Sequence, residues 1–385
     1  MSRGWKHLSI ATHWPMLVAI AILVLMGCLS IWAISPQDAR KQLLFVGGGG
    51  LLLAAVQAVS YRVVGRWAWG LYVVSLLLLL YTIIPGMPLV RAKDNVRAWL
   101  TLGPVNFQPA ELAKIGFCMV LARYLRFRSN YRTVRGLVPP FLLALAPVLL
   151  ILRQPDLGTA LVFIPALFAM LFAAGARLKH LLAVLGMGLA MAPAIWLAGT
   201  DVPLFRHLPE MIKGYQRERV YAMFSRDPRT LQRTGYQQEQ ALTAFGSGGV
   251  SGRGALNIPV GRSVPEGHND MIFALIGEQF GFVGAATLLA AYLVLFAAGI
   301  EIAAGTREPF GRLLAVGIIA LLAGQAFLNL LVATRLMPVT GITLPFVSYG
   351  GSSVLASFLA AGLLLNIAQT RPLVIARESF EFDRG

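Results

Sequence analysis

The most reactive group that the sequence presents is a carboxylate at the start of an apolar run. Asp270 follows Glu266 and His268 and directly precedes Met271 in the stretch PEGHNDMIFALIGE. A carboxylate at the border between an apolar run and a polar loop is partly desolvated, which favours its protonated form and suits it to general-base catalysis. The same position is typical of an N-cap, in which Asp270 would accept N–H bonds from a following helix. The residues alone leave both interpretations open.

A second group of charges interrupts an otherwise apolar run. Glu111 and Lys114, in QPAELAKIG, are three residues apart, so a helix would bring them to one face, where they can pair. A charge at the bilayer centre costs roughly 2.5–3.5 kcal/mol on insertion scales, which makes such residues candidates for function. One interpretation is a salt bridge that ties helices together. The other is a cation, held in place by Glu111, that binds the phosphate of an anionic lipid.

Two further residues are weaker candidates. Asp156, which lies between Pro155 and Gly158 in a tight connection, could contact substrate or could cap the next helix. His268 is a candidate ligand or base, although a single histidine in a loop is more often neither. No cluster of histidines, cysteines or carboxylates has the spacing of a tightly bound metal, so the metal stays unknown. Mg²⁺ or Mn²⁺ held loosely on a substrate diphosphate is compatible with the sequence.

The elements that position these residues are predicted to be membrane-spanning helices. Of the 385 residues, 57% are hydrophobic and 13% are charged, and the mean hydropathy is +0.69. Apolar runs of about 20 residues recur along the chain, and hydrocarbon forces their backbone groups to bond internally. We predict an all-α polytopic membrane protein, with residues 1–385 forming one domain. Its ten spans lie near residues 14–34, 43–61, 67–85, 108–124, 137–152, 159–175, 181–198, 270–295, 313–333 and 351–369.

The charge distribution predicts the orientation of these spans. The net charge is +16, and the basic residues lie in the loops between apolar runs. This favours anionic lipid headgroups and phosphates as partners, and it argues against nucleic acid. Loops on one predicted side hold more than twice as many Lys and Arg residues as the short loops on the other. Both termini are therefore expected in the cytoplasm, and the long loop at residues 199–269, between spans seven and eight, is expected outside.

Two stretches of this long loop attract attention. GYQRERVYAMFSRDP mixes apolar residues with charges, among them Arg217 and Arg219, and could form an amphipathic helix on the membrane surface. FGSGGVSGRG is rich in glycine. It could be a flexible loop, or its glycines could permit a tight turn or a close approach of backbone N–H groups to a phosphate.

The segment LMPVTGITLPFVSYGGSS, between the last two predicted spans, is too polar and too rich in Pro and Gly for a helix. Irregular backbone at membrane depth is tolerated only where it is buried in protein or lines a water-filled cavity. We therefore predict that this segment walls a cavity. The candidate cavity-lining residues are Pro345, Ser348, Tyr349, Gly350 and Ser352.

Taken in order, these stretches resemble the SEDS family of cell-wall polymerases, which includes RodA, FtsW and SpoVE. The matching stretches are NVRAWLTLG, QPAELAK, QPDLGTAL, YQRERV, GSGGVSGRG, PEGHNDMIFALIGE and MPVTGITLPFVSYGGSS. Each is a modest signal alone. Their order across nearly the whole chain makes the resemblance specific.

The resemblance implies an inverting glycosyltransferase of the GT-C type that uses lipid II. It assigns the family's essential aspartate to Asp270, although Asn269 and Met271 replace the family's Thr and Phe. The family's Glu and Lys correspond to Glu111 and Lys114, and its PDLGT aspartate corresponds to Asp156. Arg97 takes the place of an arginine near the family's Trp, whereas Ala98 stands directly before Trp99.

The resemblance also implies substrates, partners and a location. The donor would be a glycan held on undecaprenyl diphosphate and the acceptor would be lipid II, with Lys114, Arg97, Arg217 and Arg219 stabilising the leaving diphosphate. A class B penicillin-binding protein, other proteins of the elongation complex and membrane lipids would be partners. The protein would lie in the bacterial inner membrane with its active site facing outward. The short segment before the first span favours the RodA type over the FtsW type.

Three other functions stay open. A lipid II flippase or transporter would also carry intramembrane charges, but many transporters show paired sequence repeats, and none is evident here. Another lipid-sugar enzyme, such as an O-antigen ligase or polymerase, would share the large outer loop. A non-catalytic scaffold for a partner predicts that Asp270 is dispensable.

Overall fold

The computed structural model describes residues 13–369 except for residues 94, 95, 104, 129, 201, 203–206, 208–211, 213, 226 and 228–234. The predicted cytoplasmic location of the two termini therefore concerns segments outside the described residues. The same holds for Asn95 in NVRAWLTLG and for Arg226 and Pro228 in the stretch that follows Arg219.

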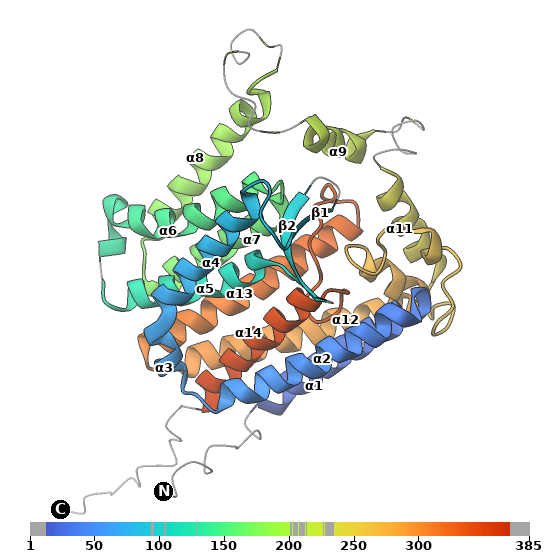
Figure 1. Ribbon diagram of the computed structural model, residues 1–385, viewed down its shortest axis with the longest axis horizontal. Helices are drawn as coiled ribbons and strands as arrows, with labels where there is room; N and C mark the ends of the chain where they lie inside the picture. Colours follow the sequence, from blue (N-terminus) through green and yellow to red (C-terminus); the bar gives the residue numbers. More distant parts are fainter. Residues whose placement is uncertain are drawn as a thin grey trace, which may run out of the picture.

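The described chain consists mostly of long helices that pack side by side (Figure 1). They are α1 (Trp14–Ile34), α2 (Pro36–Gln57), α3 (Tyr61–Val64), α4 (Ala68–Ile83), α5 (Pro109–Arg126), α6 (Val134–Arg153), α7 (Leu157–Ala174), α8 (Leu178–Leu197), α12 (Ile272–Gly305), α13 (Pro309–Ala333) and α14 (Gly351–Gln369). Within the described residues, nine segments are long and apolar enough to cross a membrane, with α3 and α4 joined into one of them. This confirms the multi-pass helical architecture.

Helix α5 corresponds to the remaining predicted span. Its 18 residues give a length of about 27 Å, close to the thickness of the hydrocarbon core. Glu111, Lys114 and its C-terminal arginines make it less apolar than the others, but most of its residues are buried against neighbouring helices. A buried position allows a helix to carry charges at membrane depth. The count of ten spans stays a prediction.

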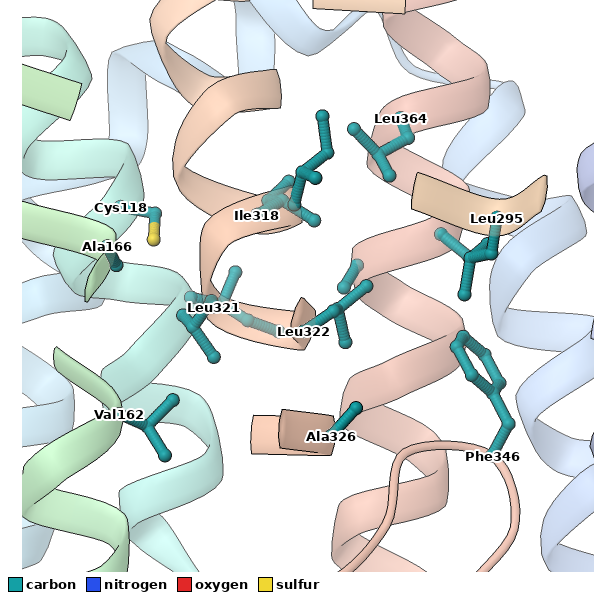
Figure 2. Packing of buried hydrophobic residues seen from close by; sticks show 14 of the residues in the cluster. Cys118, Val162, Ala166, Leu295, Ile318, Leu321, Leu322, Ala326, Phe346 and Leu364 are labelled. Carbon is teal, nitrogen blue, oxygen red and sulfur yellow. The ribbon is translucent and has the colours of Figure 1, made fainter. Parts of the chain in front are cut away.

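The core forms where the helices approach one another closely. The most extensive contacts join α14 to α2, α13 to α7, α1 to α12 and α4 to α5. Figure 2 shows Leu321 and Leu322 of α13 among buried side chains of the surrounding helices. At Gly317, an added Cβ would lie 2.6 Å from the sulfur of Met170 and 3.2 Å from that of Cys118, so the absence of a side chain lets α13 pack closely on α5 and α7. Cys28 and Cys118 are free thiols, as expected of small residues in helices.

Three details of the fold differ from the prediction. The connection between α4 and α5 forms a small antiparallel sheet of β1 (Val90–Lys93), β2 (Val96–Leu102) and β3 (Val105–Phe107), so the all-α prediction is wrong there. Along β2, Ala98 and Leu100 are buried whereas Arg97 is exposed, the alternation expected of a strand with one covered face. Helix α2 begins seven residues before the predicted span, and α12 continues ten residues beyond it.

The long connection between α8 and α12 contains helices of its own. They are α9 (Gly214–Phe224), α11 (Tyr236–Ser247) and the short 3₁₀ turn η4 (Gly261–Ser263). Figure 1 shows α9 and α11 beyond one end of the helix bundle, and α8 leaning away from it. Leu181 is the buried residue of α8, and the rest of that helix is largely exposed, a surface suited to lipid.

The glycine-rich stretch of this connection docks onto a break in α12. Gly281 has a φ of +62°, which interrupts the helix and frees backbone groups on both sides of it. The N–H groups of Arg253 and Gly254 donate to the carbonyls of Glu278 and Gln279, at 2.9 and 3.0 Å. In return, the N–H groups of Phe282 and Val283 donate to the carbonyls of Gly249 and Val250, at 2.9 and 3.1 Å. The interpretation of this stretch as a flexible loop is therefore wrong.

Candidate active site

Asp270 lies in the turn that leads into α12, and its side chain is half-buried. The N-cap of α12 is Met271, whose side chain makes no cap hydrogen bond, so Asp270 does not occupy the N-cap position. The carboxylate instead faces the irregular segment at residues 337–350. A Cβ added to Gly341 of this segment would lie 3.9 Å from Oδ2 of Asp270.

The segment at residues 337–350 is non-helical, as its composition predicts, and hydrogen bonds hold it along its length. The carbonyl of Pro345 accepts a hydrogen bond from the hydroxyl of Tyr292 at 2.6 Å. Gln42 of α2 donates to the carbonyl of Ser348 at 3.0 Å and accepts from the N–H of Gly350 at 3.3 Å. At the start of α14, Ser352 donates to a carbonyl of β3 at 2.8 Å, which joins the small sheet to the bundle.

A small cavity lies beside the beginning of this segment. Four elements line it: the start of α5, the start of α7, α13 and the segment itself. The lining residues are Gln108, Glu111, Lys114, Thr159, Val162, Gln325, Gly341, Ile342 and Thr343. Gly341 thus borders both the cavity and the carboxylate of Asp270, which places the carboxylate and Lys114 around one short stretch of backbone.

Lys114 is buried and forms two short hydrogen bonds. Its ammonium group donates to Oε1 of Glu111 at 2.8 Å and to Oε1 of Gln325 at 2.7 Å. The salt-bridge interpretation is therefore confirmed, and Gln325 extends the link from α5 to α13. An ammonium group has three N–H donors, so the two named acceptors leave capacity for a third, such as a phosphate oxygen in the cavity. The anion-binding role of Lys114 stays a prediction.

A second small cavity lies on the apolar side of the same ion pair. It shares Glu111, Lys114 and Gln325 with the first cavity. Its other lining residues are Ile115, Ile318, Leu321, Leu322, Ala356, Ser357 and Ala360. The charged pair therefore lies where a polar cavity meets an apolar one. This arrangement suits a ligand with an anionic head and a hydrocarbon chain.

Asp156 caps helix α7, which confirms the capping interpretation. Its Oδ1 accepts from the N–H of Thr159 at 2.9 Å and its Oδ2 from the hydroxyl of Thr159 at 2.8 Å. Gln108, which lines the polar cavity, donates to the same Oδ2 at 3.2 Å. Burial raises the pKa of Asp156 above its ordinary value, and the hydrogen bonds from Thr159 and the charge of Lys114 oppose this shift. A direct contact between Asp156 and substrate stays a prediction.

The remaining predicted site residues are not among those that line either cavity, and the same holds for the predicted cavity-lining residues Pro345, Ser348, Tyr349, Gly350 and Ser352. Arg219 of α9 donates to the carbonyl of Val339 at 2.9 Å, which brings it to the irregular segment. Arg217 donates to the carbonyl of Ala198, just after α8, at 2.6 Å. The ring of His268 packs edge-on against Tyr349, with 5.4 Å between ring centres. Arg97 is exposed on β2 and is not among the residues that line either cavity.

Comparison with known proteins decides the family. The family model for FtsW, RodA and SpoVE, described as "Cell cycle protein", matches residues 7–372. The chain belongs to this SEDS family. Its sequence is 36% identical to stage V sporulation protein E of Bacillus subtilis, with 92% of this chain and 94% of that protein covered. It is 32% identical to the peptidoglycan glycosyltransferase MrdB of Escherichia coli K12, with 93% and 94% covered.

Solved structures of SEDS proteins have the same fold. One of them is described as "Structural coordination of polymerization and crosslinking by a peptidoglycan synthase complex". It superposes with a TM-score of 0.80 at 33% sequence identity, and the match covers 94% of this chain and 99% of that chain. The crystal structure of RodA of Thermus thermophilus superposes with a TM-score of 0.68 at 31% identity and covers 94% and 98%. These matches confirm the SEDS membrane fold.

Several residues of this SEDS site escape prediction from the sequence. Gln325 and Asn329 are four residues apart on α13, and both amides contact the irregular segment. Gln108 and Thr159 line the polar cavity from the starts of α5 and α7. The available signal was the spacing of two amides within an apolar run. It is weaker than that of a charge, because burying a hydrogen-bonded amide costs less than burying an ion.

Proposed function

We propose that this chain is a peptidoglycan glycosyltransferase that polymerises lipid II into β-1,4-linked glycan strands. The observation that carries the proposal is the position of the Asp270 carboxylate. It is half-buried, it belongs to the residue before the N-cap of α12, and it lies beside Gly341, which lines the cavity of Lys114. Relatives of similar length are named as peptidoglycan glycosyltransferases, including MrdB of Escherichia coli and a probable FtsW of a Geobacter species at 35% identity.

The reaction needs a base because a sugar hydroxyl is a poor nucleophile. Asp270 takes the proton from the 4-hydroxyl of the acceptor GlcNAc as its oxygen attacks the anomeric carbon of the donor MurNAc. The bond from that carbon to undecaprenyl diphosphate breaks, and the diphosphate leaves with the bonding electrons. Attack opposite the leaving group inverts the anomeric centre, so an α-linked donor becomes a β-linked product.

The leaving group needs charge stabilisation rather than a proton. Lys114 lies between the polar and the apolar cavity, so it can face a lipid phosphate whose chain occupies the apolar side. Arg219, bound to the backbone at Val339, is a second cation at the same segment. Mg²⁺ or Mn²⁺ would bind together with the substrate diphosphate. Titration of either ion into the purified protein, with the polymerisation rate as the readout, tests this.

The same proposal includes a location and an orientation. The end of the bundle opposite Asp270 carries several arginines near the ends of helices. They are Arg62, Arg66, Arg126, Arg177 and Arg312. An excess of basic residues marks the cytoplasmic side, so the site faces outward. Lipid II displayed on the outer surface of the inner membrane would then reach both cavities from the bilayer.

The role in elongation, and the partner, are the finer parts of the proposal. We propose the RodA type, which has relatives in MrdB at 32% and RodA at 31% identity, whereas SpoVE at 36% and FtsW at 35% represent the alternative types. The proposed partner is a class B penicillin-binding protein. Depleting a host of its own elongation or division polymerase, and expressing this chain in each strain, tests which role it fills. Co-purification with each class B protein of the host tests the partner.

The experiment for the activity uses purified protein with lipid II in detergent, and glycan products are separated by gel electrophoresis. The expected result is polymer in the absence of any other glycosyltransferase. In a parallel arm, protein in liposomes is assayed for movement of fluorescent lipid II between leaflets. Translocation without polymer would support the flippase instead.

A further inference from the structure

The turn that carries Asp270 is fixed by its backbone. Three successive carbonyls, those of His268, Asn269 and Asp270, each accept a hydrogen bond from another part of the chain. The donors are the N–H of Tyr349 at 2.9 Å, the hydroxyl of Ser348 at 2.5 Å and the side-chain amide of Asn329 at 2.9 Å. Two of these donors belong to the irregular segment and the third belongs to α13.

Asn329 joins the two walls of the site. Its Nδ2 donates to the carbonyl of Asp270 at 2.9 Å and also to the carbonyl of Ile342 at 2.6 Å. Ile342 lies next to Gly341, which faces the carboxylate of Asp270. A side-chain amide nitrogen carries two hydrogens, and here both point at carbonyl oxygens. The side chain of Asn329 is fully buried at 0% exposure, so neither bond competes with solvent.

We propose that Asn329 is a positioning residue for Asp270. This inference rests on the proposed function. Because Asn329 holds the backbone of Asp270 and that of Ile342 at once, it fixes the distance between the carboxylate and the wall of the Lys114 cavity. Asp270 lies in the turn directly before Met271, the N-cap of α12, so the position of its carboxylate follows the position of this turn's backbone. Small displacements of a catalytic group have large effects on rate, since the reacting atoms must meet in a narrow range of geometries.

The chain offers a matched control at the opposite end of the bundle. Asn366 of α14 is 3% exposed, and its Nδ2 also bridges two carbonyls, those of Val56 and Val59, at 2.7 and 2.8 Å. The two amide nitrogens therefore make the same type of contact at a similar degree of burial, and Oδ1 of Asn366 also accepts from the N–H of Tyr61 at 2.8 Å. Asn366 lies among α2, α3 and α14, away from both cavities. Its loss should affect stability without moving the turn of Asp270.

The test compares Asn329→Ala with Asn366→Ala in purified full-length protein. Thermal melting gives the stability of each, and the initial rate of lipid II polymerisation gives kcat and KM. We expect both variants to lower the melting temperature, and Asn366→Ala at least as much as Asn329→Ala, because it also removes the acceptor of the Tyr61 N–H. Only Asn329→Ala should lower kcat, by roughly 10- to 100-fold with KM unchanged, because the lipid-binding residues stay in place. Equal kcat values in the two variants, at equal folded fractions, would overturn the inference.

A second pair of variants covers a failure of Asn329→Ala to fold. Ser348→Ala removes the donor to Asn269, and Ser75→Ala removes a buried hydroxyl that donates to the backbone within α4 at 2.7 Å. If kcat falls in Ser348→Ala but not in Ser75→Ala, hydrogen bonds to the backbone of the turn position Asp270. Equal kcat values in the two variants contradict this. Asp270→Asn is measured beside them. Full activity of Asp270→Asn would refute the proposed base, whereas an inactive Asp270→Asn with a fully active Asn329→Ala would refute only the positioning role.

Discussion

At the scale of single residues, the ion pair of Lys114 has both a structural and a chemical interpretation. The two interpretations predict different polymerisation activities when both charges are removed. The pair is almost fully buried and is shared with Gln325. Removing one partner of a buried pair leaves an uncompensated charge, which costs about 3–5 kcal/mol. A single substitution would therefore lower activity under either interpretation.

A double substitution separates the two interpretations of this pair. We expect Lys114→Ala to lower the melting temperature and to abolish polymerisation. Lys114→Met combined with Glu111→Gln removes both charges, so it should recover most of the stability. If the ammonium group stabilises a diphosphate, the double variant stays inactive. Recovery of the wild-type polymerisation rate together with stability would show that the pair only holds helices together.

Asp156 provides a test by pH. Burial raises its pKa above the ordinary value of 3.8, so the folded protein binds the proton more tightly than the unfolded chain. The stability that this proton contributes is present at low pH and is lost as the pH rises through the raised pKa. Asn caps helices as well as Asp does but carries no such charge. Asp156→Asn should therefore gain stability relative to wild type as the pH rises from 3.8 through the raised pKa.

Thermal melting across that pH range measures the Asp156 effect. The control is Asp156→Ala, which also lacks the carboxyl group but removes the cap, so it should be about 0.5–2 kcal/mol less stable than Asp156→Asn throughout. A difference between Asp156→Asn and wild type that does not change with pH would contradict the raised pKa.

At the scale of elements, the break in α12 explains why a glycine-rich loop packs so closely on a helix. At Gly281, an added Cβ would lie 2.3 Å from the backbone nitrogen of Gly252, and the φ of +62° disfavours any side chain. At Gly252, an added Cβ would lie 2.2 Å from the carbonyl oxygen of Gln279. The loop and the helix therefore share one backbone hydrogen-bond network, and the first turns of α12 position Asp270.

Gly281→Ala tests this network. A positive φ costs a non-glycine residue about 1–2 kcal/mol, and the clash with Gly252 adds to that cost, so we expect a clear drop in melting temperature. Gly254→Ala is the comparison, because it also has a positive φ but an added Cβ would meet no neighbour. Equal stability of the two variants would contradict the close packing.

How much the sequence could predict also differs between elements. Helices longer than four turns follow from runs of apolar residues, because the bilayer fixes their length and bonding. The sheet at β1 to β3 could not be predicted, since strands of three to seven residues inside a polar connection carry little periodicity. The docked glycine loop left no side-chain pattern because its bonds to α12 run between backbones. Likewise, Asn329 acts on carbonyls, which every residue possesses.

At the scale of the whole molecule, the proposed orientation places the site outside and the basic end inside. Single-cysteine labelling in intact cells tests this, after Cys28 and Cys118 are replaced by Ala. Arg262→Cys, in the exposed turn η4, should react with a membrane-impermeant maleimide from outside. Arg128→Cys, exposed after α5, should react only after lysis. Labelling of Arg128→Cys in intact cells would invert the topology.

The arrangement of the helices explains why the site joins distant parts of the chain. Helices α5, α7, α12 and α13 each present one end to the irregular segment, which supplies the common wall. A lipid substrate can enter such a site from the bilayer while its sugars stay in water, because the polar and the apolar cavity meet at Lys114. The chemistry then depends on a single carboxylate at the outer border.

The most direct measurement is the rate at which purified Asp270→Asn polymerises lipid II, set beside wild type at equal folded fraction. Asn has the size and shape of Asp but does not accept a proton from a sugar hydroxyl. We predict that wild type forms glycan strands and that Asp270→Asn, with an unchanged melting profile, forms none. Polymer made by Asp270→Asn at the wild-type rate would contradict the account.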